Sequence, residues 1–555
     1  MELRQGNGDF HKSWKPAILI TFLIMVIYLF MGTRTTLWDR DEPYYACVAV
    51  EMVQSGKYLL PTFNGKVWLE KPPLLYWLMS IPIRLLGPTE IACRFFSIVW
   101  TALASLLTFF IGYRLFSVKA GLWAMVILAS TFLILVVGSA ATTDTLLLLL
   151  TIGVMAVFLL SITSGMHLSH IILMGIALGL GMLTKGPMGL MPLPAIAIIL
   201  WLDRKNMPRT GRYIWLAGVS LSIGVLIFLA WAIPANKASN GEFLHIFIGR
   251  HVIARALKPM EHHGGNFLLH LPYYLFVIIV GFIPWTLYLP GSFSAVAGGR
   301  VGGKYGRIFL LSWIVPTFII MTLAATKLPH YILFVWPALA LAVAGTIDAA
   351  QQNRLTNRDR IWLRRGAWLF GPLAITMSLG LMIVPWFLQI PGLRWPCLAS
   401  GIVLLTMTVV SIHQQRADRP QVSAIILLTG MIVFEIPILF GVLPAIEQIK
   451  ITPAIAQAIK AKTTKEIPVA TYKYVEPTLN FYIGRQIELL YDEEAVISWS
   501  RQAREGVLII PKDKLEDIQQ SYGTLPLEEI ASKKGFNYSK GKTVEVMALI
   551  RNARK

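Results

Sequence analysis

Long apolar segments recur along most of this 555-residue chain, which is 55% hydrophobic and only 14% charged. A soluble globular protein is about one quarter charged, and a helix of roughly 17–25 apolar residues is long enough to cross a bilayer. The sequence therefore predicts an α-helical polytopic membrane protein. We expect about thirteen spans, near 16–33, 92–112, 120–138, 144–163, 169–184, 187–202, 213–234, 268–290, 307–325, 330–349, 366–388, 394–413 and 422–443.

Basic residues are concentrated in loops between these spans, as the positive-inside rule describes for loops that stay in the cytoplasm. The clearest example is the segment 351–365, which carries five arginines. The formal charge of +20 follows from such loops, and the chain shows no base-reading module that would indicate nucleic-acid binding. With an odd number of spans, the N-terminus is cytoplasmic and the chain after residue 444 is periplasmic, in a bacterial inner membrane. The first span lacks a small-residue cleavage site and is expected to be a retained anchor.

The composition divides the chain into two domains. We expect a transmembrane domain over residues 1–444, with periplasmic segments at 34–91 and 235–267, and a periplasmic α/β domain over 445–555. In that last part lysine and glutamate become more frequent and the apolar runs shorten. Strands are expected in IPVATYKY, QIELLY, GVLIIP and VEVMALI, and helices in ITPAIAQAIKAK and KDKLEDIQQSYG. The three cysteines form no spaced pair, so neither a disulfide framework nor a structural zinc site is expected.

Three acids and an arginine follow the first span in LWDRDEPYYA, residues 37–46. A solvated turn is the alternative to a functional role, and the dipole of the helix expected to follow explains one acid but hardly three. That helix places Tyr45 and Met52 on a possible membrane face. A carboxylate at a membrane surface can act as a general base toward a hydroxyl, amine or phosphate acceptor. Asp41 and Glu42 are therefore candidate catalytic groups.

Glu70 and Lys71 precede a double proline in EKPPLLYW. Paired prolines restrict the backbone and so fix the directions of both side chains, and a lysine ammonium is a common point charge for a phosphate. A lysine that merely reaches from the interface to water is the alternative. The following segment, through residue 87, is too short and too interrupted by proline to span, and is expected to lie in the interface.

Three isolated charges, Asp144, Lys185 and Lys327, each occupy a short turn on the predicted periplasmic side. An acid at membrane depth is costly and usually faces a cavity, although Asp144 could also be a helix cap. Lys327 lies beside His330 and Tyr331. The pattern predicts a shared site, and chance placement of turn residues remains the alternative.

A histidine-rich segment follows the seventh span and includes His251 and Arg255. It contains no tight ligand spacing such as HExxH, so its spacing gives only weak support for a metal site. A hydrogen-bonded loop is the favoured interpretation of this segment.

Carboxylates, cations and aromatic rings therefore collect on one side of the membrane. Cations suit a lipid phosphate, and a carboxylate suits activation of an acceptor. An enzyme that joins two lipid-linked partners fits this set better than a transporter, which tends to place charges near the midplane and to have repeated halves. A lipid-carrier flippase is the alternative from another class.

The order of these motifs resembles that of a known family. The pattern W-x-x-D-E…EKPP…YW (Trp38 to Trp77) is followed in register by Asp144, LTKGP, HVIAR, PYY, GFIPW and TKLPHYILFVWPALA. This series is similar to the bacterial lipid A aminoarabinose transferases, which are GT-C membrane glycosyltransferases of the dolichyl-phosphate-mannose-protein mannosyltransferase superfamily. The likeness covers about the first 350 residues.

The resemblance implies transfer of a sugar from an undecaprenyl-phosphate-linked donor to a periplasmic-face acceptor, and lipid A is the expected acceptor. A protein or polysaccharide acceptor is the alternative within the same superfamily. Membrane lipids are the only other expected partner, and nucleic acid is not one. No cofactor is required, but Glu70 and His251 match positions where the family can hold a divalent metal.

The resemblance also implies residue roles. Asp41, Glu42 and Asp144 are expected to be catalytic, and Lys71 and Lys327 to bind the donor phosphate. The expected substrate-binding set is Arg40, Tyr45, Lys71, Lys185, Arg255, Lys327, His330 and Tyr331.

One departure concerns the first motif. The family reads DETRYAE where this chain reads DEPYYAC, so Tyr44 replaces the family arginine. A phosphate contact is thereby lost, and Arg40 is the candidate for supplying that charge.

Overall fold

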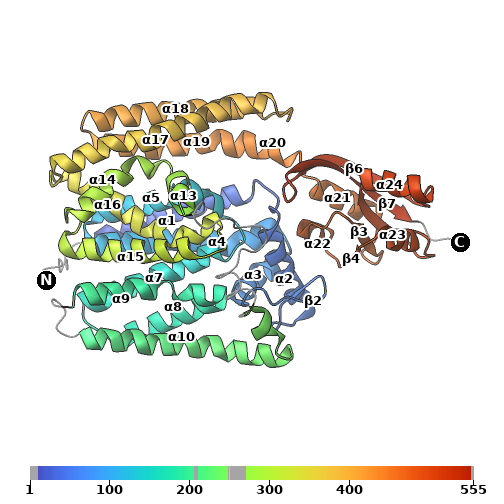
Figure 1. Cartoon of the computed structure of the whole chain (residues 1–555), viewed down its shortest axis with the longest axis horizontal. Helices are drawn as coiled ribbons and strands as arrows, with labels where there is room; N and C mark the ends of the chain where they lie inside the picture. Colours follow the sequence, from blue (N-terminus) through green and yellow to red (C-terminus); the bar gives the residue numbers. More distant parts are fainter. Residues whose placement is uncertain (1–9, 205–209, 248, 250–270, 552–555) are drawn as a thin grey trace.

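The structure is a computed structural model that describes residues 10–204, 210–247, 249 and 271–551. It consists of a bundle of long, roughly parallel helices with a small mixed domain at one end (Figure 1). Within the described residues, ten helices are long and apolar enough to cross a membrane, or eleven with one bent pair. The ten are built on α1 (Phe10–Gly32), α4 (Glu90–Leu115), α7 (Asp144–Thr163), α8 (Leu168–Lys185), α10 (Thr210–Ala238), α15 (Gly303–Leu323), α16 (Trp336–Gln351), α17 (Asn357–Ile383), α18 (Arg394–Arg416) and α19 (Pro420–Pro437).

The expected count of about thirteen spans is not confirmed. Two expected spans correspond to α5 (Val118–Ala129) and α9 (Pro192–Leu202), which have 12 and 11 residues. At 1.5 Å per residue each is under about 20 Å long, whereas the hydrocarbon core is about 30 Å thick. A third expected span is the bent pair, formed by α13 (Tyr273–Gly281) and the helical segment Trp285–Ala297, which meet at 112°.

Short helical pieces connect or extend the long helices. They are α6 (Phe132–Val137), η1 (Gly186–Leu190), η3 (Trp285–Tyr288), α14 (Leu289–Ala297), η4 (Pro329–Val335), η5 (Val384–Trp386), η6 (Ile438–Val442) and α20 (Leu443–Glu447). Most of them start at or beside a proline or glycine, residues that interrupt a regular helix. Hydropathy alone does not detect such breaks, which is why it overcounts the spans.

The chain between α1 and α4 forms a cap at the end of the bundle that adjoins the small domain (Figure 1). It contains α2 (Asp41–Ser55), the hairpin β1 (Thr62–Phe63) and β2 (Lys66–Val67), and α3 (Leu74–Leu86). Leu85 is 78% exposed, as expected for an interfacial helix. The expectation that Tyr45 and Met52 face the membrane is wrong, because both side chains are buried in the core between α2 and α3.

The C-terminal domain is a five-stranded sheet in the order β4-β3-β5-β7-β6. Helices α21 and α22 pack on one face of the sheet, and α23 and α24 on the other. The strands are β3 (Val469–Tyr472), β4 (Ile487–Leu490), β5 (Gly506–Pro511), β6 (Glu528–Asn537) and β7 (Lys542–Arg551), and the helices are α21 (Thr452–Lys462), α22 (Pro477–Ile483), α23 (Glu493–Ser500) and α24 (Lys512–Tyr522). The expected α/β domain is thus confirmed, but β6, α22 and α23 were missed.

Specific hydrogen bonds hold this domain against the cap. The Asn64 side chain donates to the Ile487 carbonyl and accepts from the Ile487 amide, both at 2.8 Å. The Tyr482 hydroxyl accepts from the Leu37 amide at 2.7 Å and donates to Glu90 at 2.9 Å. The Thr478 amide at the start of α22 donates to the Asp39 carboxylate just before α2, at 3.3 Å, so the starts of the two helices lie side by side.

Candidate active-site cavity

A polar cavity of about 410 Å³ lies where the cap, the bundle and the C-terminal domain meet. It is lined by residues from seven separate segments of the chain. They are Arg40, Asp41, Tyr44, Tyr45, Trp68, Glu70, Lys71, Thr143, Asp144, Lys185, Leu328, His330, Tyr331, Val475, Glu476, Pro477, Ser539 and Lys540.

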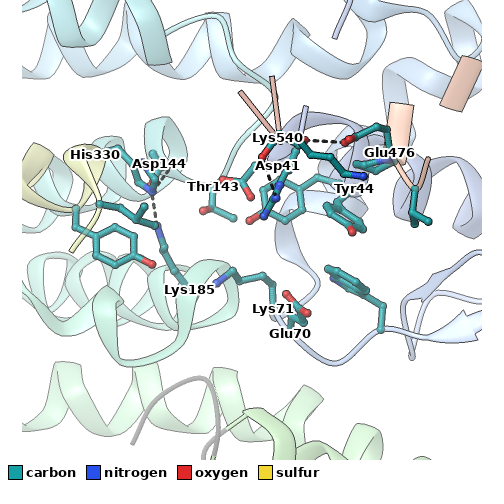
Figure 2. Close-up of a pocket in the computed structure, with 18 residues that line it drawn as sticks. Asp41, Tyr44, Glu70, Lys71, Thr143, Asp144, Lys185, His330, Glu476 and Lys540 are labelled. Atoms are coloured by element: carbon teal, nitrogen blue, oxygen red, sulfur yellow. Dashed lines mark hydrogen bonds and ion pairs between the residues drawn. The ribbon is translucent and has the colours of Figure 1, made fainter. Parts of the chain in front are cut away.

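One wall of the cavity is an ion pair between two adjacent helices. Asp144 is the first residue of α7, and its carboxylate lies 2.7 Å from the Lys185 ammonium at the end of α8. His330 Nε2 is 4.0 Å from the other oxygen of Asp144, and the Tyr331 ring lies 4.7 Å from the Lys185 nitrogen. Figure 2 shows Asp144, Lys185 and His330 grouped on one side of the cavity. The structure thus brings together two of the three isolated charges.

The third isolated charge, Lys327, does not line the cavity. Its ammonium donates to the carbonyls of Thr322 and Ala324, at 2.5 and 2.9 Å, and so satisfies the last turn of α15. The side chain is 6% exposed, and burial lowers the pKa of its ammonium below the ordinary value. The structure gives Lys327 no place in the cavity lining, and its predicted contact with the donor phosphate stays a prediction.

Glu42 also lies outside the cavity and forms a buried ion pair with Arg94. Arg94 donates from Nε to Oε1 of Glu42 at 2.9 Å and from Nη2 to Oε2 at 2.7 Å. The same carboxylate accepts from the amides of Trp38 and Ala141, at 2.9 and 2.8 Å. Burial alone would raise the pKa of Glu42, but Arg94 holds it below the ordinary value. The catalytic prediction for Glu42 is therefore replaced by a structural role.

Asp41 faces the cavity although it is adjacent to Glu42. Successive residues of a helix point about 100° apart, so one acid enters the core and the other stays exposed to the cavity. Tyr45, one turn further along α2, is buried, and after burial the charges of Asp41 and Asp144 contribute to raising its pKa. The carboxylates of Asp41 and Asp144 are therefore both close enough to Tyr45 to affect it electrostatically.

Arg40, Glu70 and Lys71 also line the cavity, as the sequence predicted. Arg40 precedes α2, and its guanidinium donates to the Ser539 carbonyl of the C-terminal domain at 3.5 Å. Glu70 and Lys71 lie just before α3, and the double proline that follows them leads directly into that helix. Figure 2 shows Lys71 beside Glu70, with its side chain extending toward Lys185.

The sequence analysis missed the contribution of the C-terminal domain. Glu476 is 5% exposed, and its carboxylate accepts from the Asn537 amide group at 2.9 Å and from the Ser539 hydroxyl at 2.7 Å. The Lys540 ammonium donates to the Lys473 carbonyl at 2.9 Å. No local pattern marks these residues, because the cap residues that line the same cavity lie more than 400 positions earlier in the sequence.

Aromatic rings form the wall next to Glu476. The Tyr44 ring stacks on Trp68 with centroids 5.0 Å apart and planes at 21°, and Phe63 lies 4.8 Å from Tyr44. Trp68 was not predicted as a site residue, and Tyr44 was noted only as the replacement for an arginine. Thr143, before α7, is the remaining polar residue that was missed.

The metal prediction is not tested. Glu70 lines the cavity, whereas His251 and Arg255 lie outside the described residues. Within the described part of the chain, no group of three or more His, Cys, Asp or Glu side chains could hold a metal ion.

The cavity thus combines four cationic side chains with four carboxylates at the end of a membrane-spanning bundle. Fixed cations stabilise a phosphate that leaves with added charge, and an exposed carboxylate can accept a proton from an attacking group. The arrangement is suited to group transfer from a lipid phosphate.

Comparison with known proteins gives a consistent result. Residues 70–231 match the model of the dolichyl-phosphate-mannose-protein mannosyltransferase family. The chain is 30% identical over 413 residues to an undecaprenyl phosphate-α-4-amino-4-deoxy-L-arabinose arabinosyl transferase of Pectobacterium carotovorum, covering 72% of each chain. It is 30% identical over 377 residues to the protein of the same name from Edwardsiella ictaluri, covering 66% of this chain and 65% of the relative, slightly under two thirds of its length.

Solved structures agree on the fold. The chain is similar to ArnT from Cupriavidus metallidurans bound to undecaprenyl phosphate, with a TM-score of 0.75 at 19% identity over 96% of this chain and 97% of that one. A more distant likeness joins it to the Archaeoglobus fulgidus oligosaccharyltransferase, with a TM-score of 0.51 at 11% identity over 96% of this chain and 70% of that one.

Proposed function

This chain belongs to the family of bacterial undecaprenyl phosphate-α-4-amino-4-deoxy-L-arabinose arabinosyl transferases, and from that membership we propose that it is a pentosyltransferase. It moves 4-amino-4-deoxy-L-arabinose from undecaprenyl phosphate to a phosphate group of lipid A. The cavity at the end of the bundle, lined by the exposed Asp41 and by Lys71, is the observation that supports this reaction. We place the protein in the bacterial inner membrane, with the N-terminus cytoplasmic and the cavity periplasmic.

The donor phosphate binds between the cap and the bundle. Lys71 provides one cation, and Arg40 provides a second in the absence of the arginine that Tyr44 replaces. The undecaprenyl chain extends from this point along α3, whose exposed Ile81, Leu85 and Leu86 supply an apolar surface. A lysine and an arginine that are already in place lower the cost of the charge that develops on the departing phosphate.

The transfer is a single displacement at the anomeric carbon. An oxygen of the acceptor attacks that carbon, and the bond from the carbon to the phosphate oxygen breaks, its electron pair passing to undecaprenyl phosphate. Asp41 accepts the proton of the acceptor or orients its oxygen. Attack from the side opposite the leaving phosphate inverts the anomeric configuration. The Asp144–Lys185 pair keeps the opposite wall in position.

Mass spectrometry of lipid A tests this function. Cells that lack the gene are complemented with the wild type, with D41N, or with E494Q, which alters an exposed glutamate of the C-terminal domain. The wild type and E494Q should restore lipid A that carries one aminopentose, whereas D41N should not, at equal membrane levels of each protein. Unchanged lipid A with a glycan or protein that lacks its sugar would contradict the acceptor. If cells that lack the gene showed no change in lipid A, glycans or proteins but retained the sugar-linked carrier on the cytoplasmic leaflet, the protein would be a flippase instead.

A further inference from the structure

The C-terminal domain places a buried carboxylate at the edge of the cavity. Glu476 directly precedes α22, and both of its oxygens accept hydrogen bonds from neutral groups, those of Asn537 and Ser539. Within the described residues, no lysine, arginine or histidine forms an ion pair with it, although its residue is only 5% exposed. A buried charge without a counter-charge is costly, so this carboxylate is suited to a cationic ligand.

Two cations of the cavity wall, Lys540 and Arg40, form hydrogen bonds with backbone carbonyls of the C-terminal domain. Lys540 donates to the carbonyl of Lys473, and Arg40 donates to the carbonyl of Ser539. Both contacts attach these side chains to the backbone of the C-terminal domain. Neither side chain forms an ion pair with Glu476 in the part of the chain that the structure describes.

The wall beside Glu476 is aromatic. Tyr44 stacks on Trp68, and Figure 2 shows Tyr44 next to Glu476, across the cavity from the Asp144–Lys185 pair. After burial, the charges of Glu70 and Glu476 raise the pKa of Tyr44, while Arg40 lowers it. Aromatic faces attract cations and pack against the C–H groups of a sugar ring. Tyr44 stands where the family has an arginine, so this position adds no positive charge beside Glu476.

We propose that Glu476 and the Tyr44–Trp68 stack form a subsite for the protonated amine of an amino sugar. This inference rests on the proposed function and adds that the C-terminal domain selects the sugar. An ammonium group has three donors, and a carboxylate that already accepts two hydrogen bonds has lone pairs left for it. The stacked rings bind the apolar face of the same sugar.

The test compares two donors with the full-length protein reconstituted in liposomes that contain lipid A. Both donors are undecaprenyl phosphate pentoses, identical except that one carries an amine at position 4 and the other a hydroxyl. The wild type should prefer the amine by about tenfold or more in kcat/KM, as a charge-assisted hydrogen bond implies. E476Q should reduce transfer of the amino sugar by about 10- to 100-fold and leave transfer of the hydroxy sugar within about twofold.

Two further variants separate recognition from structure. E476D keeps the charge and should retain the preference for the amine, and E494Q should behave as the wild type with both donors. Equal use of both donors by the wild type, or an equal loss of both in E476Q, would overturn the subsite while transfer by the wild type upholds the proposed function. Failure of the wild type to transfer either sugar would overturn the proposed function and the subsite together.

Discussion

Replacing Glu42 by alanine is expected to destabilise the folded protein and not merely to slow the transfer reaction. The substitution leaves the Arg94 guanidinium buried without its carboxylate and removes the acceptor of the Trp38 and Ala141 amides. Breaking one partner of a buried ion pair typically costs about 3–5 kcal/mol. That cost applies where α1, α2 and the segment before α7 meet. Asp41 is the first residue of α2 and so depends on this junction.

Hydrogen exchange of the purified protein measures this effect locally. A loss of 3–5 kcal/mol increases the opening equilibrium by roughly two to three and a half orders of magnitude, so the amides of Trp38 and Ala141 should exchange correspondingly faster. The double variant E42A/R94L removes the stranded charge and should be more stable than E42A. D41N, one residue away, should leave exchange unchanged because Asp41 is exposed to the cavity.

The structural role of Glu42 would be refuted by normal exchange in an inactive E42A protein. That result would return Glu42 to the catalytic group. A double variant less stable than E42A would also contradict the reasoning, because the isolated charge of Arg94 is the main source of the expected loss.

Three further predictions concern the cavity and the contact between the domains. Burial, followed by the charge of Glu476, raises the pKa of Asp39 to about 6. The folded state thus binds this proton more tightly than the unfolded state, whose pKa is near 3.9. Stability should therefore rise as the pH falls from about 6 to 4, and D39N should abolish this component of a pH series of unfolding curves. N64A should weaken docking of the C-terminal domain by about 1–3 kcal/mol, measured as faster proteolysis at the α20–α21 connection, and equal rates would contradict it. R40A should raise the Kd for undecaprenyl phosphate at least about fivefold, and unaltered binding in a carrier titration would exclude Arg40 from the phosphate site.

The transmembrane architecture was predictable because apolar segments and basic loops are properties of continuous sequence. The short helices α5 and α9 were not, because their residues are as apolar as those of a full span. What distinguishes them is a break at Ser130 and Thr131 in one case and the η1 turn in the other. β6 was missed because its sequence, EEIASKKGFN, is mostly polar and lies on an edge strand, where no regular apolar alternation is required.

The site was predictable to the extent that it depends on unusual local residues. Asp41, Lys71, Asp144 and Lys185 stand out as charges beside apolar sequence, and the structure brings all four to one cavity. Glu42 stands out equally, but its orientation depends on Arg94, 52 positions later.

Other site residues give no such local signal. Lys327 turns toward the backbone of α15, and a lysine near a turn has the same sequence pattern whether it faces backbone or ligand. Glu476 belongs to a different domain, and only the docked fold shows that it reaches the cavity.

Single-turnover transfer by the purified protein decides whether Asp41 is the catalytic carboxylate. Wild-type and D41N proteins are mixed with undecaprenyl-phosphate-linked aminoarabinose and lipid A, and both donor binding and product are measured. The account predicts that D41N binds the donor with an unchanged Kd but forms no glycosylated lipid A, while the wild type does so with inversion at the anomeric carbon. Product formed by D41N at the wild-type rate would contradict it.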